Sequence, residues 1–237
     1  MEQRRGSAGP PISHNLPAEV ASFIGRDHDR AEVAHLLSTA RLLTLTGVGG
    51  CGKTRLALRA AADLLPRFRD GVWVVSLAPL AGASLVDRAV ATALGVRGSP
   101  GRPLLASLAV ALTGRQMLLL LDNCEHLLGA AARLAETLLR ACPQVRILAT
   151  SREPLRIAGE SVWRIRPLAL PTAPSDANPA TTTDALAALS RVEAIALFLD
   201  RACARVPAFT LTAENAPFVI GICRHLEGLP LGIELAA

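Results

Sequence analysis

The residues with the clearest chemical potential form one glycine-rich stretch, GVGGCGKT, at positions 47–54. Its spacing matches G-x-x-x-x-G-K-[ST], a loop whose backbone N–H groups surround phosphate oxygens. In such a loop Lys53 reaches the β- and γ-phosphates of a nucleotide, and the Thr54 hydroxyl is a ligand of Mg²⁺. An ordinary glycine-rich turn is the alternative. The predicted phosphate contacts are Gly47, Gly49, Gly50, Cys51, Gly52, Lys53, Thr54 and the adjacent Arg55.

Lys53 is also the single lysine of the chain, which has 25 basic residues in all. A lysine carries a compact ammonium charge on a flexible stem, whereas an arginine carries a planar guanidinium. A chain that uses arginine elsewhere and lysine here indicates a position where a point charge is needed. This observation supports the phosphate site independently of the glycine spacing.

A second group of candidates follows two apolar segments further along the chain. Asp122 comes directly after MLLLL at 117–121 and is predicted to hold Mg²⁺ together with Thr54. Capping of the next helix is its alternative role. Glu125 is a candidate to activate the attacking water, because the position after Asp122 is asparagine. Arg152 follows another apolar segment and is predicted to sense the γ-phosphate; a plain surface arginine is the alternative.

The elements that must position these residues alternate short apolar runs with amphipathic stretches, a pattern typical of α/β proteins. Near-continuous apolar runs favour parallel strands covered on both faces. The predicted strands are Leu42–Thr46, Val72–Ser76, Met117–Leu121, Val145–Thr150 and, more weakly, Val162–Ile165. The predicted helices are Arg30–Ser38, Thr54–Leu65, Leu85–Leu94, Leu104–Leu112, Glu125–Ala141, Arg191–Ala204, Ala213–His225 and a last one from Leu231 onward.

The expected fold is therefore a P-loop NTPase α/β domain, with a parallel sheet of about five strands flanked by helices. The start of a small helical domain follows it. Residues rich in Pro, Ala, Thr and Ser separate the two and indicate a flexible linker. The predicted divisions are a flexible segment at 1–18, the nucleotide-binding domain at 19–167, the linker at 168–189 and a partial helical domain at 190–237. The chain ends within an apolar helical pattern, which predicts that this domain is cut short.

Composition excludes several classes of protein. The chain of 237 residues is 51% hydrophobic and 19% charged, which excludes intrinsic disorder and a collagen-like fibre. It contains neither an apolar run long enough to span a bilayer nor a secretory signal, so a cytoplasmic protein without membrane contact is expected. The five cysteines lack metal-ligand spacing and are predicted to be reduced core residues. The net charge of +5 comes from scattered arginines and indicates ordinary solvated surface.

Five motifs in one order resemble the NB-ARC type of STAND nucleotide-binding module, as found in bacterial LuxR-type and SARP-type transcriptional regulators. The resemblance runs from about residue 16 to residue 237. The motifs are FIGRD at 23–27, GVGGCGKT at 47–54, LLLLDNCEHLL at 118–128, LATSREPLRIAGE at 148–160 and GLPL at 228–231.

The resemblance implies a nucleotide-dependent switch that binds ATP or ADP with Mg²⁺ and hydrolyses ATP slowly. It places Ile24 and Arg26 near the adenine and ribose, and Pro230 against the base. It also implies that the ADP state is closed, that the ATP state opens and self-associates, and that DNA is contacted only through effector domains absent from this chain.

Three other functions stay open. The first is a productive ATPase that uses Glu125 as its water activator. The second is a regulator that binds DNA by itself, although the predicted C-terminal helices are apolar and rich in alanine. The third is a truncated remnant without effector output.

Overall fold

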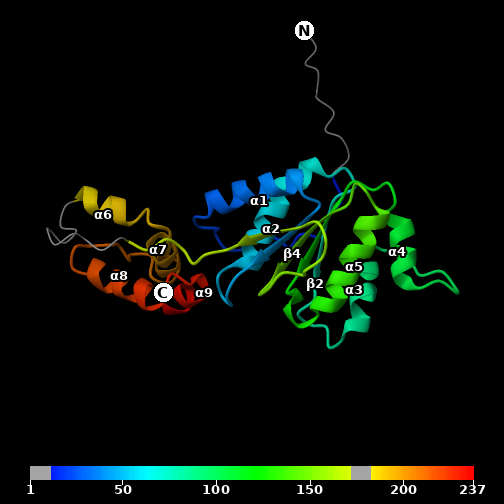
Figure 1. Ribbon diagram of the computed structural model, residues 1–237. Helices are drawn as coiled ribbons and strands as arrows, with labels where there is room; N and C mark the ends of the chain where they lie inside the picture. Colours follow the sequence, from blue (N-terminus) through cyan, green and yellow to red (C-terminus); the bar gives the residue numbers. More distant parts are fainter. Residues whose placement is uncertain (1–11, 172–182) are drawn as a thin grey trace, which may run out of the picture.

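The computed structural model describes residues 12–171 and 183–237. Figure 1 shows two parts: a parallel sheet with helices on both faces, and a smaller group of helices at the C-terminal side. We call them the sheet domain and the helical domain. None of the described helices combines the length and hydropathy needed to cross a membrane.

The sheet domain is built on β1 (Leu42–Thr46), β2 (Val72–Ser76), β3 (Leu118–Asp122), β4 (Arg146–Ser151) and β5 (Glu160–Arg164). All pairings are parallel, and the strand order is β2-β3-β4-β1-β5. The carboxyl ends of β1, β3 and β4 therefore lie next to one another at one edge. Ligands of open parallel sheets bind at this edge.

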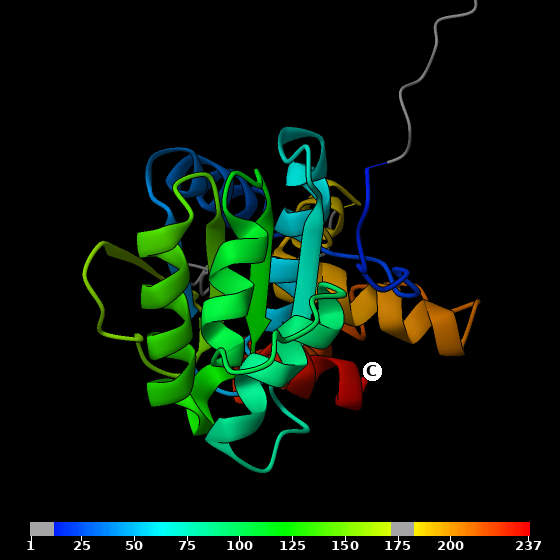
Figure 2. The same cartoon turned by 90° about the vertical axis from the view of Figure 1, so that its right-hand side faces the viewer.

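Helices cover both faces of the sheet, which explains why the central strands are apolar throughout. α1 (Asp27–Thr39) and α2 (Lys53–Leu64) share a buried core with β1 and β3 on one face. α3 (Val86–Ala93), α4 (Leu104–Leu112) and α5 (Leu128–Ala141) cover the other face. Figure 2 looks onto this second layer. Three short 3-10 turns complete the domain at Leu65–Arg67, Ala83–Leu85 and Cys124–His126.

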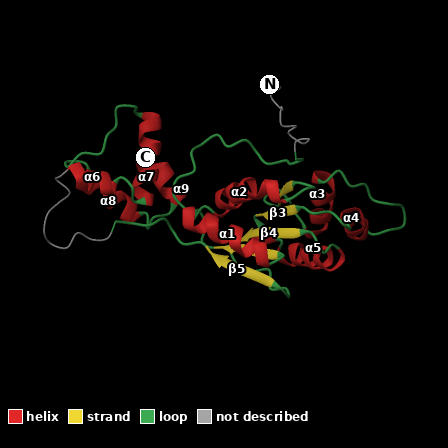
Figure 3. Ribbon diagram, turned by 90° about the horizontal axis from the view of Figure 1, so that it is seen from above, coloured by secondary structure: helices red, strands yellow, loops and turns green. Residues whose placement is uncertain are grey.

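The helical domain contains α6 (Thr183–Leu189), α7 (Glu193–Arg205), α8 (Ala216–His225) and α9 (Pro230–Ala236). Seen from above in Figure 3, these helices lie beside the sheet domain at the end of β5 and α1. α7, α8 and α9 enclose a separate core. Its buried residues are Leu168, Ala194, Ile195, Leu197, Phe198, Ala202, Val219, Cys223 and Ile233.

Two segments that the sequence predicts to be flexible contain ordered residues where the structure describes them. In the segment assigned to a linker, α6 is helical and Leu168 is buried in the helical core, where its N–H donates to the Gly228 carbonyl at 2.9 Å. In the N-terminal segment, the Asn15 side chain pairs with the backbone of Val74 in β2. The rest of both segments, residues 1–11 and 172–182, lies outside the described residues.

The cysteines give a first prediction. Cys51, Cys124, Cys142 and Cys223 are buried, whereas Cys203 is half-buried. Burial raises the pKa of Cys124 to about 12 and that of Cys223 to about 11, so these thiols stay protonated and unreactive at neutral pH. We expect one thiol to react quickly with a disulfide reagent at pH 8 in the native protein, and all five after denaturation. Two or more fast thiols in the native protein would contradict this packing.

Candidate functional site

The glycine-rich loop joins the carboxyl end of β1 to the first turn of α2, as its motif predicts. Gly50 and Gly52 have φ of 76° and 92°, a conformation that L side chains rarely adopt. A Cβ atom on Gly47 would lie 2.9 Å from both the Cys51 Sγ and the Ile165 carbonyl oxygen. The loop is therefore tightly folded at a helix N-terminus, where backbone dipoles favour bound anions.

Lys53 and Thr54 begin α2, so the helix fixes the place of both side chains. The Lys53 ammonium donates to the loop carbonyls of Gly47 and Val48 at 2.9 and 3.0 Å. The charge thus lies over the loop, within reach of a phosphate that the loop holds.

Asp122 joins the loop to the neighbouring strands. Its Oδ1 accepts hydrogen bonds from the Thr54 hydroxyl and from the Thr150 hydroxyl, each at 2.7 Å. Thr150 is buried in β4 and also accepts from the backbone N–H of Asn123 at 2.9 Å. Carboxylate and hydroxyl oxygens are the donors that Mg²⁺ prefers, so Thr54 and Asp122 fit that ion. Sequence reasoning did not single out Thr150, although a hydroxyl residue at the end of an apolar strand was a usable signal.

Glu125 and Arg152 meet at the rim of the site. Asn123 adopts a left-handed conformation with φ 62°, and the 3-10 turn that follows carries Glu125 back toward β4. Arg152 Nε lies 3.5 Å from Glu125 Oε1, while Glu125 Oε2 is buried and has no hydrogen-bond partner among the residues that the structure describes. The Arg152 guanidinium also approaches within 3.9 Å of the place that a Cβ on Gly49 would occupy. Arg152 therefore approaches the loop, and Glu125 lies beside Arg152.

Arg26 binds the loop through a loop carbonyl. Its guanidinium donates to the Cys51 carbonyl at 2.7 Å, to the Arg166 carbonyl at 2.8 Å and to Asp29 at 2.9 Å. The side chain is buried, so these partners compensate its charge. Ile24, two residues earlier, packs against the core of the helical domain. Arg26 thus contacts the loop itself, and its guanidinium is engaged by protein groups.

The first turn of α9 rests on the loop. The N–H of Leu231 donates to the Gly50 carbonyl at 3.2 Å, and its Cβ is 3.1 Å from where a Cβ on Gly50 would be. Pro230 Cγ lies 3.8 Å from the corresponding place at Gly52. A Cβ on Gly50 would force Leu231 to shift, whereas one on Gly52 would only make ordinary contact with Pro230. The glycine at position 50 therefore permits this close interdomain contact.

Arg55 is hydrogen-bonded to residues outside the loop. Its guanidinium donates to Glu234 of α9 at 2.7 Å and to the carbonyls of Ala21 and Ser22 at 3.2 and 2.7 Å. The sequence motif predicted a nucleotide contact for Arg55, but its partners in the structure lie between the domains. The structure places Asp122, Arg152 and Pro230 close to residues of the loop, and Glu125 beside Arg152.

A separate hollow lies at the opposite edge of the sheet. Its volume is about 440 Å³, and residues next to the amino ends of β3 and β4, Gln116 and Arg146 among them, line it. Arg146 is engaged there by the carbonyls of Leu37 and Ala40. Because the phosphate-binding loop lies at the carboxyl ends of the strands, we place the functional site at the loop and not in this hollow.

Comparison with known proteins identifies the family of the sheet domain. The family model of the AAA domain matches residues 34–157, just over half of the chain. A "Putative HTH-type transcriptional regulator" of Mycobacterium bovis is 45% identical over 202 residues, which make up 85% of this chain and 20% of that protein. An uncharacterized protein of Mycobacterium tuberculosis is 39% identical over 226 residues, 95% of this chain and 52% of that protein. This chain thus spans between a fifth and about half of these relatives.

A solved structure shares the fold. A signal transduction ATPase with numerous domains (STAND), a protein of Pyrococcus horikoshii with a tetratricopeptide repeat sensor, aligns with a TM-score of 0.54 at 14% identity. The alignment covers 93% of this chain and 30% of the other. The five-stranded parallel sheet with its flanking helices is a P-loop NTPase α/β fold.

Proposed function

Because the chain belongs to the family of AAA domains, we propose that it is a nucleotide-dependent switch module of the NB-ARC type. It binds ADP and ATP at loop 47–54 with Mg²⁺ and hydrolyses ATP slowly. ADP keeps the helical domain closed on the loop, and ATP releases it. A ligand shifts such an equilibrium only as far as its affinities for the two states differ.

The observation that carries the proposal is the contact between α9 and the loop. The carbonyl of Gly50 accepts the N–H of Leu231, so the loop that would hold the phosphates also holds the helical domain. The Leu231 side chain also packs against Gly50. A phosphate that reshapes this loop changes the surface on which α9 rests, which couples occupancy to domain position.

Each residue of the site has a defined task. Lys53 binds the β- and γ-phosphates, and Arg152 at the rim responds to the γ-phosphate. Thr54 and Asp122 would hold Mg²⁺, which when bound neutralises the phosphate oxygens. The side chain that follows Asp122 is the amide of Asn123, which cannot accept a proton from water as a carboxylate does. Turnover is therefore slow.

The nucleoside is expected on the helical side of the loop. Ile24 packs against the core of the helical domain, and Pro230 approaches Gly52 of the phosphate-binding loop. We assign the base and ribose to this region, with Arg26 holding the loop from the buried side. Adenine as the base follows from the NB-ARC resemblance.

We propose that the protein acts as a cytoplasmic regulator. A relative with 45% identity is named as an HTH-type transcriptional regulator, and this chain matches 20% of its length. We propose that any DNA contact in such a protein comes through segments outside the matched part. Self-association in the ATP state and the absence of membrane contact complete this proposal.

A second candidate is a productive ATPase. Within the described part of the chain, the buried Oε2 of Glu125 has no hydrogen-bond partner, and the carboxylate lies at the rim of the site beside Arg152. A carboxylate in such a position can activate a water molecule. This function differs from the switch in its rate of turnover.

One experiment separates the two functions. The purified full chain is denatured, the released nucleotide is identified, and phosphate release is followed under excess Mg²⁺-ATP. The switch predicts co-purified ADP and turnover far below the ~1 s⁻¹ at which ordinary enzymes begin. Fast multiple turnover that Glu125→Gln abolishes would instead support the ATPase. Glu153→Gln is the matched control, because Glu153 is an exposed neighbour paired with Arg156.

A further inference from the structure

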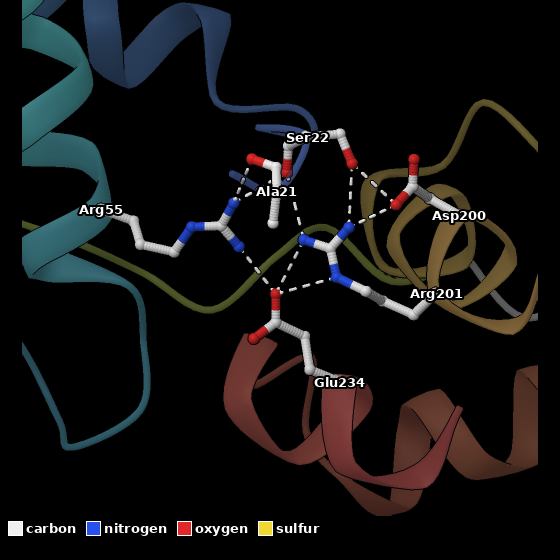
Figure 4. A network of polar contacts seen from close by, with 6 residues as sticks. All are labelled: Ala21, Ser22, Arg55, Asp200, Arg201 and Glu234. Carbon is white, nitrogen blue, oxygen red and sulfur yellow. Dashed lines mark hydrogen bonds and ion pairs between the residues drawn. The ribbon is translucent and has the colours of Figure 1, made fainter. Parts of the chain in front are cut away.

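Two arginines from two helices meet on one carboxylate oxygen of a third helix, between the domains (Figure 4). Oε1 of Glu234 in α9 accepts from Nη1 of Arg55 in α2 at 2.7 Å. The same oxygen accepts from Nη2 and Nε of Arg201 in α7 at 2.9 and 3.2 Å. We call these three residues the Glu234 cluster. Glu234 and Arg201 are 26% and 14% exposed, so the cluster is partly shielded from solvent and salt.

The members of the cluster belong to different domains. Arg201 and Glu234 both lie in the helical domain, so their pairing persists if the domains separate. Arg55 lies in the sheet domain, one residue after Thr54 on the first turn of α2. Its contact with Glu234 crosses the interface from the helix turn that begins with Lys53.

Ala21 and Ser22, which precede α1, lie between the two arginines. The Ser22 carbonyl accepts from Arg55 at 2.7 Å and from Arg201 at 3.1 Å. The Ser22 hydroxyl accepts from Arg201 at 2.9 Å and donates to Asp200 at 2.7 Å. Ala21 adds a second carbonyl for Arg55.

These additional partners make the crossing contact reversible. Breaking an ion pair is costly when it leaves a shielded charge alone. Here Glu234 keeps Arg201, and Arg55 keeps the carbonyls of Ala21 and Ser22. Opening the interface therefore leaves no charge of the cluster without a partner.

We propose that the Glu234 cluster is a latch that holds the helical domain closed over the phosphate-binding loop, with Arg55 as its release point. Arg55 is a positioning residue in this role and does not touch the nucleotide. The link between the latch and the nucleotide rests on the proposed function: phosphate binding shifts the first turn of α2 and moves Arg55 relative to Glu234.

The test measures the distance between the domains in the full chain without nucleotide. Spin labels are attached at Arg115→Cys and Glu214→Cys, two exposed positions in the sheet and helical domains, in a Cys203→Ser background. The protein with no further change is compared with Arg55→Gln, Glu234→Gln and the double variant. Arg59→Gln is the matched control, because Arg59 lies one turn further along α2 and pairs with Glu19 and Asp63.

The latch predicts longer and broader distance distributions for Arg55→Gln and Glu234→Gln, with no further change in the double variant and none in Arg59→Gln. A distribution for Arg55→Gln that matches the unchanged protein would overturn the latch. If Arg55→Gln fails to fold, Arg55→Lys decides, because a lysine keeps the charge but cannot bridge the carboxylate and the two carbonyls in the same fork. Its distribution is then expected to widen.

The release rate of fluorescent ADP from the same samples tests the coupling to the loop. We expect Arg55→Gln to release ADP about 5- to 10-fold faster, the low end of typical coupling between sites. A longer interdomain distance with an unchanged release rate would overturn the coupling. If the unchanged protein binds no nucleotide, the proposed function fails, while the distance measurement still decides the latch.

Discussion

Replacement of Lys53 by alanine is expected to raise the Kd for ADP and ATP about a hundredfold or more. The ammonium is placed over the loop by α2 and would form charge-assisted hydrogen bonds with phosphate oxygens. Such bonds contribute roughly 1.5–3 kcal/mol each, and about 2.8 kcal/mol corresponds to a hundredfold change in Kd. Titration with a fluorescent nucleotide measures the change.

Two controls isolate the role of the ammonium. Lys53→Arg keeps the charge but replaces a compact cation by a planar one, so affinity is expected to stay well below that of the unchanged protein. Arg59→Gln removes a positive charge from the same helix outside the loop, and it should leave the Kd unchanged. Equal affinity in Lys53→Ala and the unchanged protein would show that phosphates bind elsewhere.

Replacement of Asp122 by asparagine is expected to remove the Mg²⁺-dependent part of ATP affinity. The amide side chain keeps the size of the carboxylate and an oxygen for the hydroxyls of Thr54 and Thr150, but it lacks the negative charge that attracts the cation. Loss of groups around a bound metal typically costs 10- to 100-fold in metal affinity. The measurement is the Kd for ATP with Mg²⁺ and with a chelator.

The matched control for this prediction is Thr150→Ser, which retains the hydroxyl that donates to Asp122. We expect its Mg²⁺ dependence to equal that of the unchanged protein. If Asp122→Asn responds to Mg²⁺ as the unchanged protein does, the ion is held by other groups and the assignment of Asp122 is wrong.

Much of the sheet domain could be predicted because its buried strands are apolar without interruption. The bounds of β1, β2 and α4 agree with the predicted ones, and those of β3 and β4 differ by one residue. β5 was less clear because it lies at the edge of the sheet and is only partly covered. The start of α5 was placed too early, since Asn123 in a left-handed conformation and a 3-10 turn precede the helix.

The phosphate-binding part of the site could be predicted for a different reason. The loop residues are consecutive in the sequence. Asp122 ends β3, and only β4 lies between β3 and β1, the strand that leads into the loop. The interdomain contacts could not be predicted in the same way. Arg55 and Glu234 are 179 positions apart, and no local pattern pairs one surface arginine with one glutamate. The role of Arg55 was therefore predicted from its place beside the motif, because its partners could not be identified from the sequence.

The most direct test of the switch is the interdomain distance of the labelled chain, with Arg115→Cys and Glu214→Cys, at saturating ADP and at saturating ATP with Mg²⁺. The predicted result is a closed distribution with ADP and a shift toward longer distances with ATP, absent in Lys53→Ala. Bound ADP and bound ATP that give the same distribution would contradict the switch.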